Sequence, residues 1–179
     1  MMAIREVTRN TKLYLASPQL ATCMAYRDAA TEFWQCAEAY YRLNISKDKF
    51  TMSKVVFYLI GLSLELYCKA FIILAEDTQK GYEDKKKKLK NIKIRHNLSL
   101  LCAEAKRKGL SSLTKEDRGL IYELNNKYYS CSNFRYKQGV IIDATEVANF
   151  LEIELPSLRY YFALMLKIQK EANRKIYAR

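Results

Sequence analysis

The sequence contains little proline, glycine and histidine, and this scarcity restricts the fold. Among 179 residues there are 2 Pro, 5 Gly and 1 His, while half of the residues are apolar. No segment alternates apolar and polar residues as half-buried strands do. Because turn-forming residues are rare, long uninterrupted elements are favoured over many short strands. We therefore predict an all-α fold, and the length favours one domain over residues 1–179.

The sequence patterns of metal sites and of phosphate-binding loops are also missing. The cysteines are odd in number and have no C-x-x-C spacing; they are Cys23, Cys36, Cys68, Cys102 and Cys131. With one histidine in the chain they do not form a Cys/His zinc site, and there is no glycine-rich phosphate loop, H-E-x-x-H pattern or Ser-His-Asp set. We predict no metal and no cofactor. The cysteines are interpreted as small buried side chains in a reducing compartment.

The N-terminal segment, Met1 to Leu15, has scattered charges and no apolar core, which is unlike a secretory signal. We expect a cytoplasmic protein.

Apolar residues at helical spacing predict five helical segments. The first spans 17–43, with Ser17 as N-cap, and the second begins at Phe50 or Thr51. A third follows the N-cap Asn97 and ends at Gly109, and a fourth runs from Thr114 to about Tyr129. The last starts near residue 144 and is kinked or split at Pro156. We expect the segments 77–95 and 130–142 to be connections, with a short frayed helical piece within 77–95 as an alternative.

The most apolar segment runs from Val55 to Ala75 and is long enough to cross a bilayer. Glu65 and Lys69 argue against that, since a charged side chain near the membrane centre costs about 2.5 to 3.5 kcal/mol. The two residues lie one helical turn apart, Glu before Lys, in the order that favours an ion pair. We predict a central helix of a bundle and no membrane partner.

The net charge of +12 is concentrated in one part of the chain. Residues 80–109 hold eleven Lys and Arg but three acidic residues, so this segment alone carries +8. Such a surplus attracts anionic partners such as RNA, a nucleotide or an acidic protein. The alternative, which we favour, is that Lys85 to Lys88 form a solvated, mobile loop, because no aromatic residues are interleaved for base stacking.

Three segments resemble the HEPN domain family of small helical bundles. Leu64-Glu65-Leu66-Tyr67-Cys68-Lys69-Ala70 is similar to its Glu-Leu-x-x-Lys-Ala pattern. Arg95-His96-Asn97-Leu98-Ser99-Leu100-Leu101 is similar to its His-Asp-Leu-x-x-Leu helix start, with Asn97 in place of Asp. Residues 120–136 are similar to its Tyr-containing helix end followed by Arg-Tyr.

The resemblance covers about residues 17–172 and implies an up-and-down bundle of four to five helices, often a homodimer. It also implies functions around RNA or nucleotides. Many members are ribonuclease toxins, and others pair with a nucleotidyltransferase-like partner. The family's ribonuclease motif places an Arg four to six residues before a His. No Arg stands at that distance before His96, so we lean against an enzyme.

Six residues are candidates for ligand binding: Glu65, Lys69, Arg95, His96, Arg135 and Tyr136. Glu65 and Lys69 can line a phosphate-binding pocket, or form a buried ion pair that fixes helix packing, which we favour. His96 can act as a general acid or base, or bond to nearby backbone, which we favour. Arg135 and Tyr136 can bind an anion and stack on a base, or pair and pack at the surface.

Three functions follow from these observations. The first is a non-catalytic HEPN-like module that binds nucleotide, RNA or a partner protein, within a toxin–antitoxin or phage-defence pair. The second is a divergent metal-independent ribonuclease that uses His96 with Arg95 or Arg135. The third is a structural adaptor that recruits another subunit.

Overall fold

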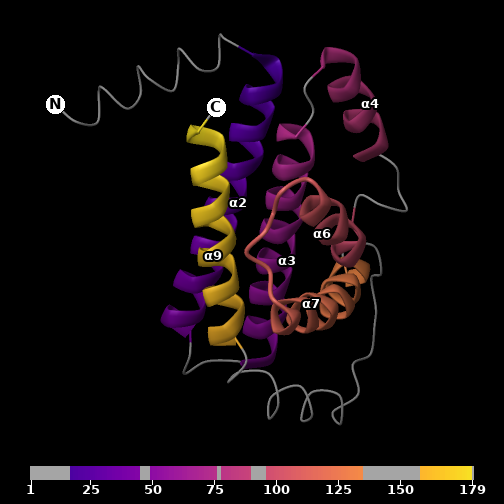
Figure 1. Ribbon diagram of the computed structural model, residues 1–179. Coiled ribbons are helices and arrows are strands. Elements are labelled where there is room, and N and C mark those ends of the chain that lie inside the picture. The colour runs from indigo at the N-terminus through magenta and orange to yellow at the C-terminus, as the bar shows by residue number, and fades with distance from the viewer. Residues whose placement is uncertain (1–16, 45–48, 76–77, 90–95, 135–157, 179) are drawn as a thin grey trace, which may run out of the picture.

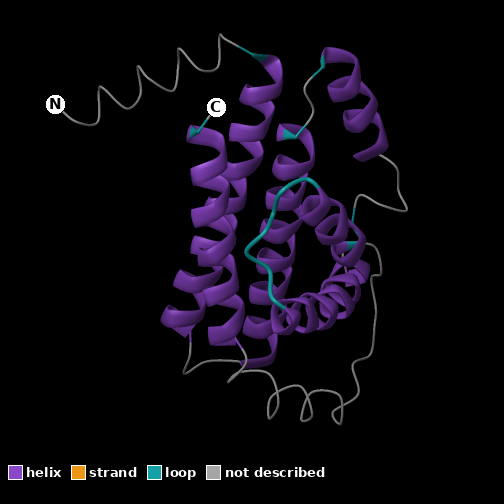
Figure 2. Cartoon of the chain, viewed as in Figure 1, coloured by secondary structure: helices purple, strands orange, loops and turns teal. Residues whose placement is uncertain are grey.

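The computed structural model describes residues 17–44, 49–75, 78–89, 96–134 and 158–178. All regular elements in these ranges are helices, and the predicted all-α class is confirmed (Figure 2). They are α2 (Pro18–Asn44), α3 (Lys49–Leu74), α4 (Gln79–Leu89), α6 (Leu98–Arg107), α7 (Lys115–Phe134) and α9 (Leu158–Tyr177).

Helix α3 is the centre of the bundle and contacts each of the other five helices (Figure 1). Helices α2 and α3 run antiparallel, and α9 lies beside both of them. The pair α6 and α7 packs against another side of α3, and α4 lies near the end of α3 that carries Leu74. The predicted core position of the Val55 to Ala75 segment is therefore confirmed.

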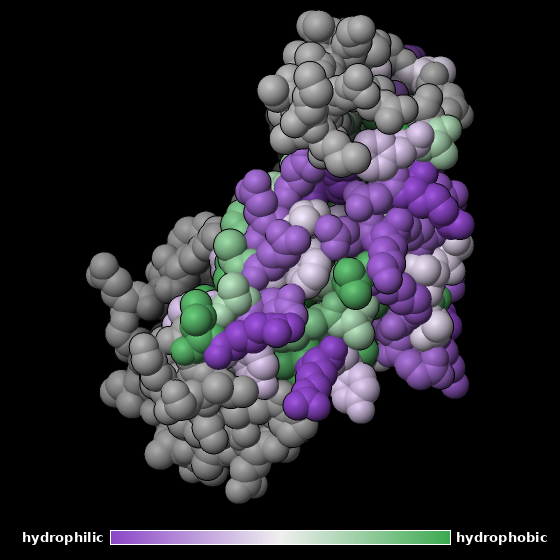
Figure 3. Space-filling model, turned by 90° about the vertical axis from the view of Figure 1, so that its left-hand side faces the viewer, coloured by the Kyte–Doolittle hydropathy of each residue, from purple (hydrophilic) through white to green (hydrophobic). Residues whose placement is uncertain are grey.

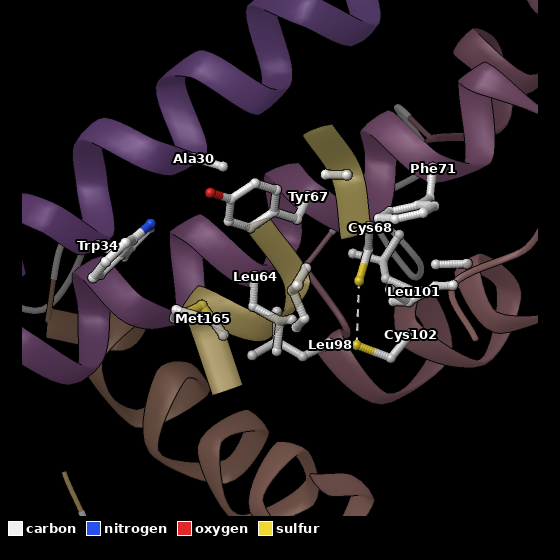
Figure 4. Close-up of a cluster of buried hydrophobic side chains, with 14 of the residues drawn as sticks. Ala30, Trp34, Leu64, Tyr67, Cys68, Phe71, Leu98, Leu101, Cys102 and Met165 are labelled. Atoms are coloured by element: carbon white, nitrogen blue, oxygen red, sulfur yellow. Dashed lines mark hydrogen bonds between the residues drawn. The ribbon is translucent and has the colours of Figure 1, made fainter. Parts of the chain in front are cut away.

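The segment Val55–Leu74 satisfies the length and composition of a membrane span, and 72% of it is buried inside the bundle. Core helices meet the same criteria. Its side chains form one continuous apolar core with the other helices, in which Tyr67, Tyr161 and Phe57 are among the largest fully buried groups. The rings of Phe57 and Tyr161 meet edge to face, with centroids 5.5 Å apart. Part of this core is drawn in Figure 4.

Several helix ends lie where the sequence predicts them. The Ser17 Oγ accepts a hydrogen bond from the Leu20 N–H at 3.4 Å, and Asn97 caps α6. Gly109 follows α6 with a φ of 109°, a left-handed conformation that glycine adopts without strain. Thr114 and Asp117 exchange hydrogen bonds at the start of α7.

Two predictions are wrong. Lys85 to Lys88 do not form a mobile loop but lie in α4, so the alternative of a short helical piece within 77–95 is the correct one. Tyr82 and Leu89 are buried on the core and hold that helix in place. Helix α7 extends to Phe134 and not to Tyr129, since the polar residues after Tyr129 are weak helix formers but not helix breakers. The predicted helix start near residue 144 and the kink at Pro156 lie outside the described residues.

The prediction of buried cysteines is correct for Cys23, Cys68 and Cys102 and wrong for Cys36, which is exposed. Cys36 lies on α2 beside Ala37, and Ala37, not Cys36, points into the core. Helical spacing places only one of two neighbours on the buried face.

A buried carboxylate holds the connection between α6 and α7 against α9. Glu171 is 5% exposed and accepts hydrogen bonds from the Ser111 and Ser112 backbone N–H groups at 2.8 and 2.9 Å. Burial by itself would raise the pKa of this carboxyl, but the hydrogen bonds from Ser111 and Ser112 outweigh it and lower the pKa. The anchored connection fixes where α7 begins.

Figure 3 shows the flank of the bundle that lies on the left of Figure 1 as a mainly hydrophilic face with scattered apolar groups. Exposed large apolar side chains include Leu43, Tyr160 and Leu166. Single exposed apolar groups are common on folded proteins. The homodimer implied by the family resemblance stays a prediction.

Gly61 of α3 lies directly against the ring of Tyr128 on α7. A Cβ atom at this position would lie 2.4 Å from Cδ2 and 2.6 Å from Cγ of the Tyr128 ring. We predict that Gly61→Ala lowers the free energy of unfolding by about 1 to 3 kcal/mol, because the ring has to move. Urea denaturation followed by circular dichroism measures the effect.

Gly119 provides the matched control. It also lies within a helix, but nothing is within 4 Å of an added Cβ. Gly119→Ala is expected to raise the free energy of unfolding by roughly 0.5 to 1 kcal/mol, because alanine loses less backbone entropy than glycine on folding. The two substitutions therefore have opposite signs. Equal effects would contradict a close contact at Gly61.

Candidate functional site

The centre of α3 carries a buried carboxylate, Glu65, which is 2% exposed. An unpaired carboxylate at such a position costs several kcal/mol. Both of its oxygens accept hydrogen bonds, from Lys69 on the same helix, His96 before α6 and Tyr128 on α7. We call these four residues the Glu65 cluster.

The contacts in the Glu65 cluster are short. Lys69 Nζ lies 2.5 Å from Oε1 of Glu65, and the Tyr128 hydroxyl donates to Oε2 at 2.8 Å. His96 Nδ1 lies 2.9 Å from the same Oε2. The Lys69 side chain is 11% exposed, so the ion pair that the sequence predicts is present and largely shielded from water. Lys69 neutralises Glu65 and does not point to an outside ligand.

Polar side chains also hold the start of α6, next to His96. Asn97 Oδ1 accepts a hydrogen bond from the Leu100 N–H at 3.0 Å, as the predicted N-cap requires. Asn125 of α7 accepts one from the Leu98 N–H at 2.8 Å. Two of the free N–H groups at this helix end are thereby satisfied. The start of α6 is therefore held to α7 through its backbone and to α3 through the His96 side chain.

The contact with Glu65 determines which nitrogen of His96 carries the proton when the ring is neutral. A carboxylate only accepts hydrogen bonds, so Nδ1 must donate. The lone pair is then on Nε2, and the His96 side chain is 42% exposed. A carboxylate that orients an imidazole in this way is a common arrangement in acid–base catalysis. His96 can therefore accept a proton at Nε2.

The predicted candidates are only partly brought together. Glu65, Lys69 and His96 form one cluster, whereas Arg95, Arg135 and Tyr136 lie outside the described residues. The contact that we favoured for His96, neighbouring backbone, is replaced by a carboxylate 31 residues away. Packing of α6 on α3 brings the two together. Sequence reasoning missed Tyr128, although a tyrosine on an inner helix face indicates a hydroxyl in need of a buried partner.

A second group of polar residues surrounds α6 on its outer side. Lys85 of α4 contacts Glu104 at 3.0 Å, and Arg107 pairs with the same carboxylate. The hydrogen bond from Lys85 lowers the pKa of Glu104, with further contributions from Arg107 and Lys88. The carboxylate of Glu104 therefore interacts with three cations from two helices.

On the other side of α6, a cavity of about 240 Å³ opens between α6 and α7. Lys106 and Arg118 line it together with Tyr122, whose side chain is 64% exposed. We call Lys106, Arg118 and Tyr122 the basic surface. Its two cationic residues are both exposed. Tyr122 of α7 supplies an aromatic ring in the same cavity as Lys106 of α6.

Within the described part of the chain, no group of three or more His, Cys, Asp or Glu side chains can hold a metal ion. Comparisons with protein-family models, curated proteins and solved structures give no match. The resemblance to the HEPN family stays a prediction that rests on the three sequence segments.

The Glu65 contact predicts the tautomer of His96. Because this is the only histidine of the chain, its two ring nitrogens give unambiguous signals in two-bond ¹H–¹⁵N correlation spectra. At alkaline pH we expect the Nδ1–H form to predominate, since Glu65 accepts that hydrogen bond. The urea-unfolded chain, which has no such contact, serves as control. A folded protein with the same tautomer ratio as the unfolded chain would disprove the pairing.

Proposed function

We propose that the chain is a non-catalytic, HEPN-like helical module that binds single-stranded RNA through the basic surface, within a toxin–antitoxin or phage-defence pair. The observation that carries the proposal is that two exposed cations, Lys106 of α6 and Arg118 of α7, line one cavity together with the exposed Tyr122. Packing of α6 against α7 makes this surface.

This combination suits single-stranded RNA. Cations of the basic surface neutralise phosphates, and an aromatic face stacks on a base whatever its identity. Lys106, Arg118 and Tyr122 line the same cavity, so a phosphate and its neighbouring base can be bound together.

The Glu65 cluster has a supporting role in this proposal. Lys69 is paired with Glu65 and shielded, so the phosphate contacts are assigned to the exposed cations and not to Lys69. The cluster joins α3, α6 and α7, and therefore sets the position of the two helices that carry the basic surface. Ligand binding and fold stability thus depend on different residues.

The test is fluorescence anisotropy of a labelled single-stranded RNA over a salt series. We expect the double substitution Lys106→Gln and Arg118→Gln to lower the slope of log Kd against log salt by about 0.7 for each lost phosphate contact. Tyr122→Ala is expected to weaken binding by about 1 to 3 kcal/mol, because base stacking is lost, while Tyr122→Phe retains it.

A control variant removes equal charge elsewhere. Arg159→Gln with Lys170→Gln changes one exposed Arg and one exposed Lys of α9, and neither residue lines the cavity between α6 and α7. It should leave the salt slope nearly unchanged. Equal losses in both double variants would reject the basic surface as the binding site. Absence of any salt-sensitive RNA binding would reject the proposal and favour the adaptor function.

The pairing of Glu65 with His96 favours a second candidate function, a metal-independent ribonuclease. In that mechanism Nε2 of His96 would take the proton of a ribose 2′-hydroxyl, which then attacks the adjacent phosphorus. Glu65 would orient the ring and stabilise its protonated form. The absence of an Arg four to six residues before His96 weighs against this candidate.

An RNA cleavage assay decides between the two functions. If the chain is a ribonuclease, His96→Ala should lower the rate by roughly 100-fold or more, as expected for loss of a general base. Tyr122→Phe, which leaves the Glu65 cluster intact, is the control. Full cleavage by the His96→Ala variant would exclude His96 catalysis, and absence of cleavage by the unmodified protein would support the non-catalytic proposal.

A further inference from the structure

Two cysteine side chains from different helices face each other in the core. Cys68 lies on α3 and Cys102 on α6, and their sulfur atoms are 3.2 Å apart (Figure 4). A disulfide needs about 2.05 Å between the sulfurs, so the two must move together by little more than an ångström. The pair is separated by 34 positions in the sequence. It does not have the C-x-x-C spacing of common redox motifs.

The two thiols differ in their access to small molecules. Cys68 is fully buried, whereas Cys102 is 5% exposed and lines the cavity between α6 and α7. Leu113 and Ile121 form apolar parts of the same lining, and Lys106 follows Cys102 by one helical turn. A small neutral oxidant that enters the cavity therefore reaches Cys102 first.

We propose that Cys68 and Cys102 form a reversible disulfide, a modification site that links α3 to α6, when a hydroperoxide enters the cavity. With hydrogen peroxide as the hydroperoxide, the first step breaks the O–O bond: the Cys102 sulfur takes one oxygen to become a sulfenic acid, and the leaving hydroxide takes the Cys102 proton to form one water. In the second step the Cys68 sulfur attacks the Cys102 sulfur and displaces hydroxide, which takes the Cys68 proton to become a second water. Two thiols lose two electrons in total, and one hydroperoxide is reduced.

The order of these steps follows from the environment of each thiol. The hydrogen bond with Cys102 and complete burial raise the pKa of the Cys68 thiol well above its usual range. Cys68 therefore stays protonated until its neighbour has been oxidised, and then acts as the resolving thiol. A low-molecular-weight dithiol would reduce the disulfide by thiol–disulfide exchange at the Cys102 sulfur, which is nearer the cavity.

The position of the bond relates it to the Glu65 cluster. Cys68 adjoins Lys69 on α3, and Cys102 lies on the helix whose start is held beside His96. The disulfide would tie the two helices that meet at this cluster. The inference does not depend on RNA binding, because it rests on sulfur geometry and cavity access alone.

The experiment uses the full chain with Cys36→Ser, which removes the exposed cysteine. The protein is treated with hydrogen peroxide, unfolded in the presence of iodoacetamide and mapped by mass spectrometry. We expect a Cys68–Cys102 cross-linked peptide, two hydrogen atoms lighter than the two thiol peptides together, that disappears after dithiothreitol. In the Cys68→Ser variant, we expect a Cys102 sulfenic acid that dimedone traps.

Three outcomes would overturn the proposal. One is that both thiols remain available to iodoacetamide at a peroxide concentration that oxidises Cys36 of the unmodified chain. Another is that Cys102 advances to a sulfinic acid without a cross-link to Cys68. The third is a cross-link of Cys102 to Cys131 in its place. Circular dichroism of each variant before oxidation verifies that it is folded, and Cys68→Ala replaces Cys68→Ser if the latter unfolds.

Discussion

The buried carboxylate of Glu65 is the constraint on which the arrangement of the helices depends. A charge 2% exposed at the centre of the most apolar helix is tolerated only if its hydrogen-bonding capacity is used. Lys69 meets part of this need from the same helix, but His96 and Tyr128 come from elsewhere. Helix α3 therefore orients its neighbours through these hydrogen bonds as well as through apolar packing. Apolar packing alone would allow the helices to slide along one another.

Local signals account for the parts of the fold that the sequence predicts well. The caps at Ser17, Asn97 and Gly109 and the Glu65–Lys69 pair all depend on residues within five positions of each other. Backbone hydrogen bonding and helical spacing determine such features directly. The central place of the Val55 to Ala75 segment followed from composition in the same way.

The parts that were missed depend on contacts between distant residues. Helix α4 is polar by composition, and what holds it is the burial of Tyr82 and Leu89 on a core that local pattern does not reveal. Tyr128 was not among the predicted site residues, although its hydroxyl contacts Glu65. Tyr122 was not a candidate at all, since its significance comes from Lys106 on another helix.

Helix α6 connects the two hypotheses about function. His96 precedes its first turn, and Lys106 and Arg107 lie in its last, so a ten-residue helix of about 15 Å separates them. Binding alone requires only the cations and Tyr122, whereas cleavage also requires a group that protonates the leaving oxygen. Lys69 is held by Glu65, so that second group would have to come from residues beyond the Glu65 cluster.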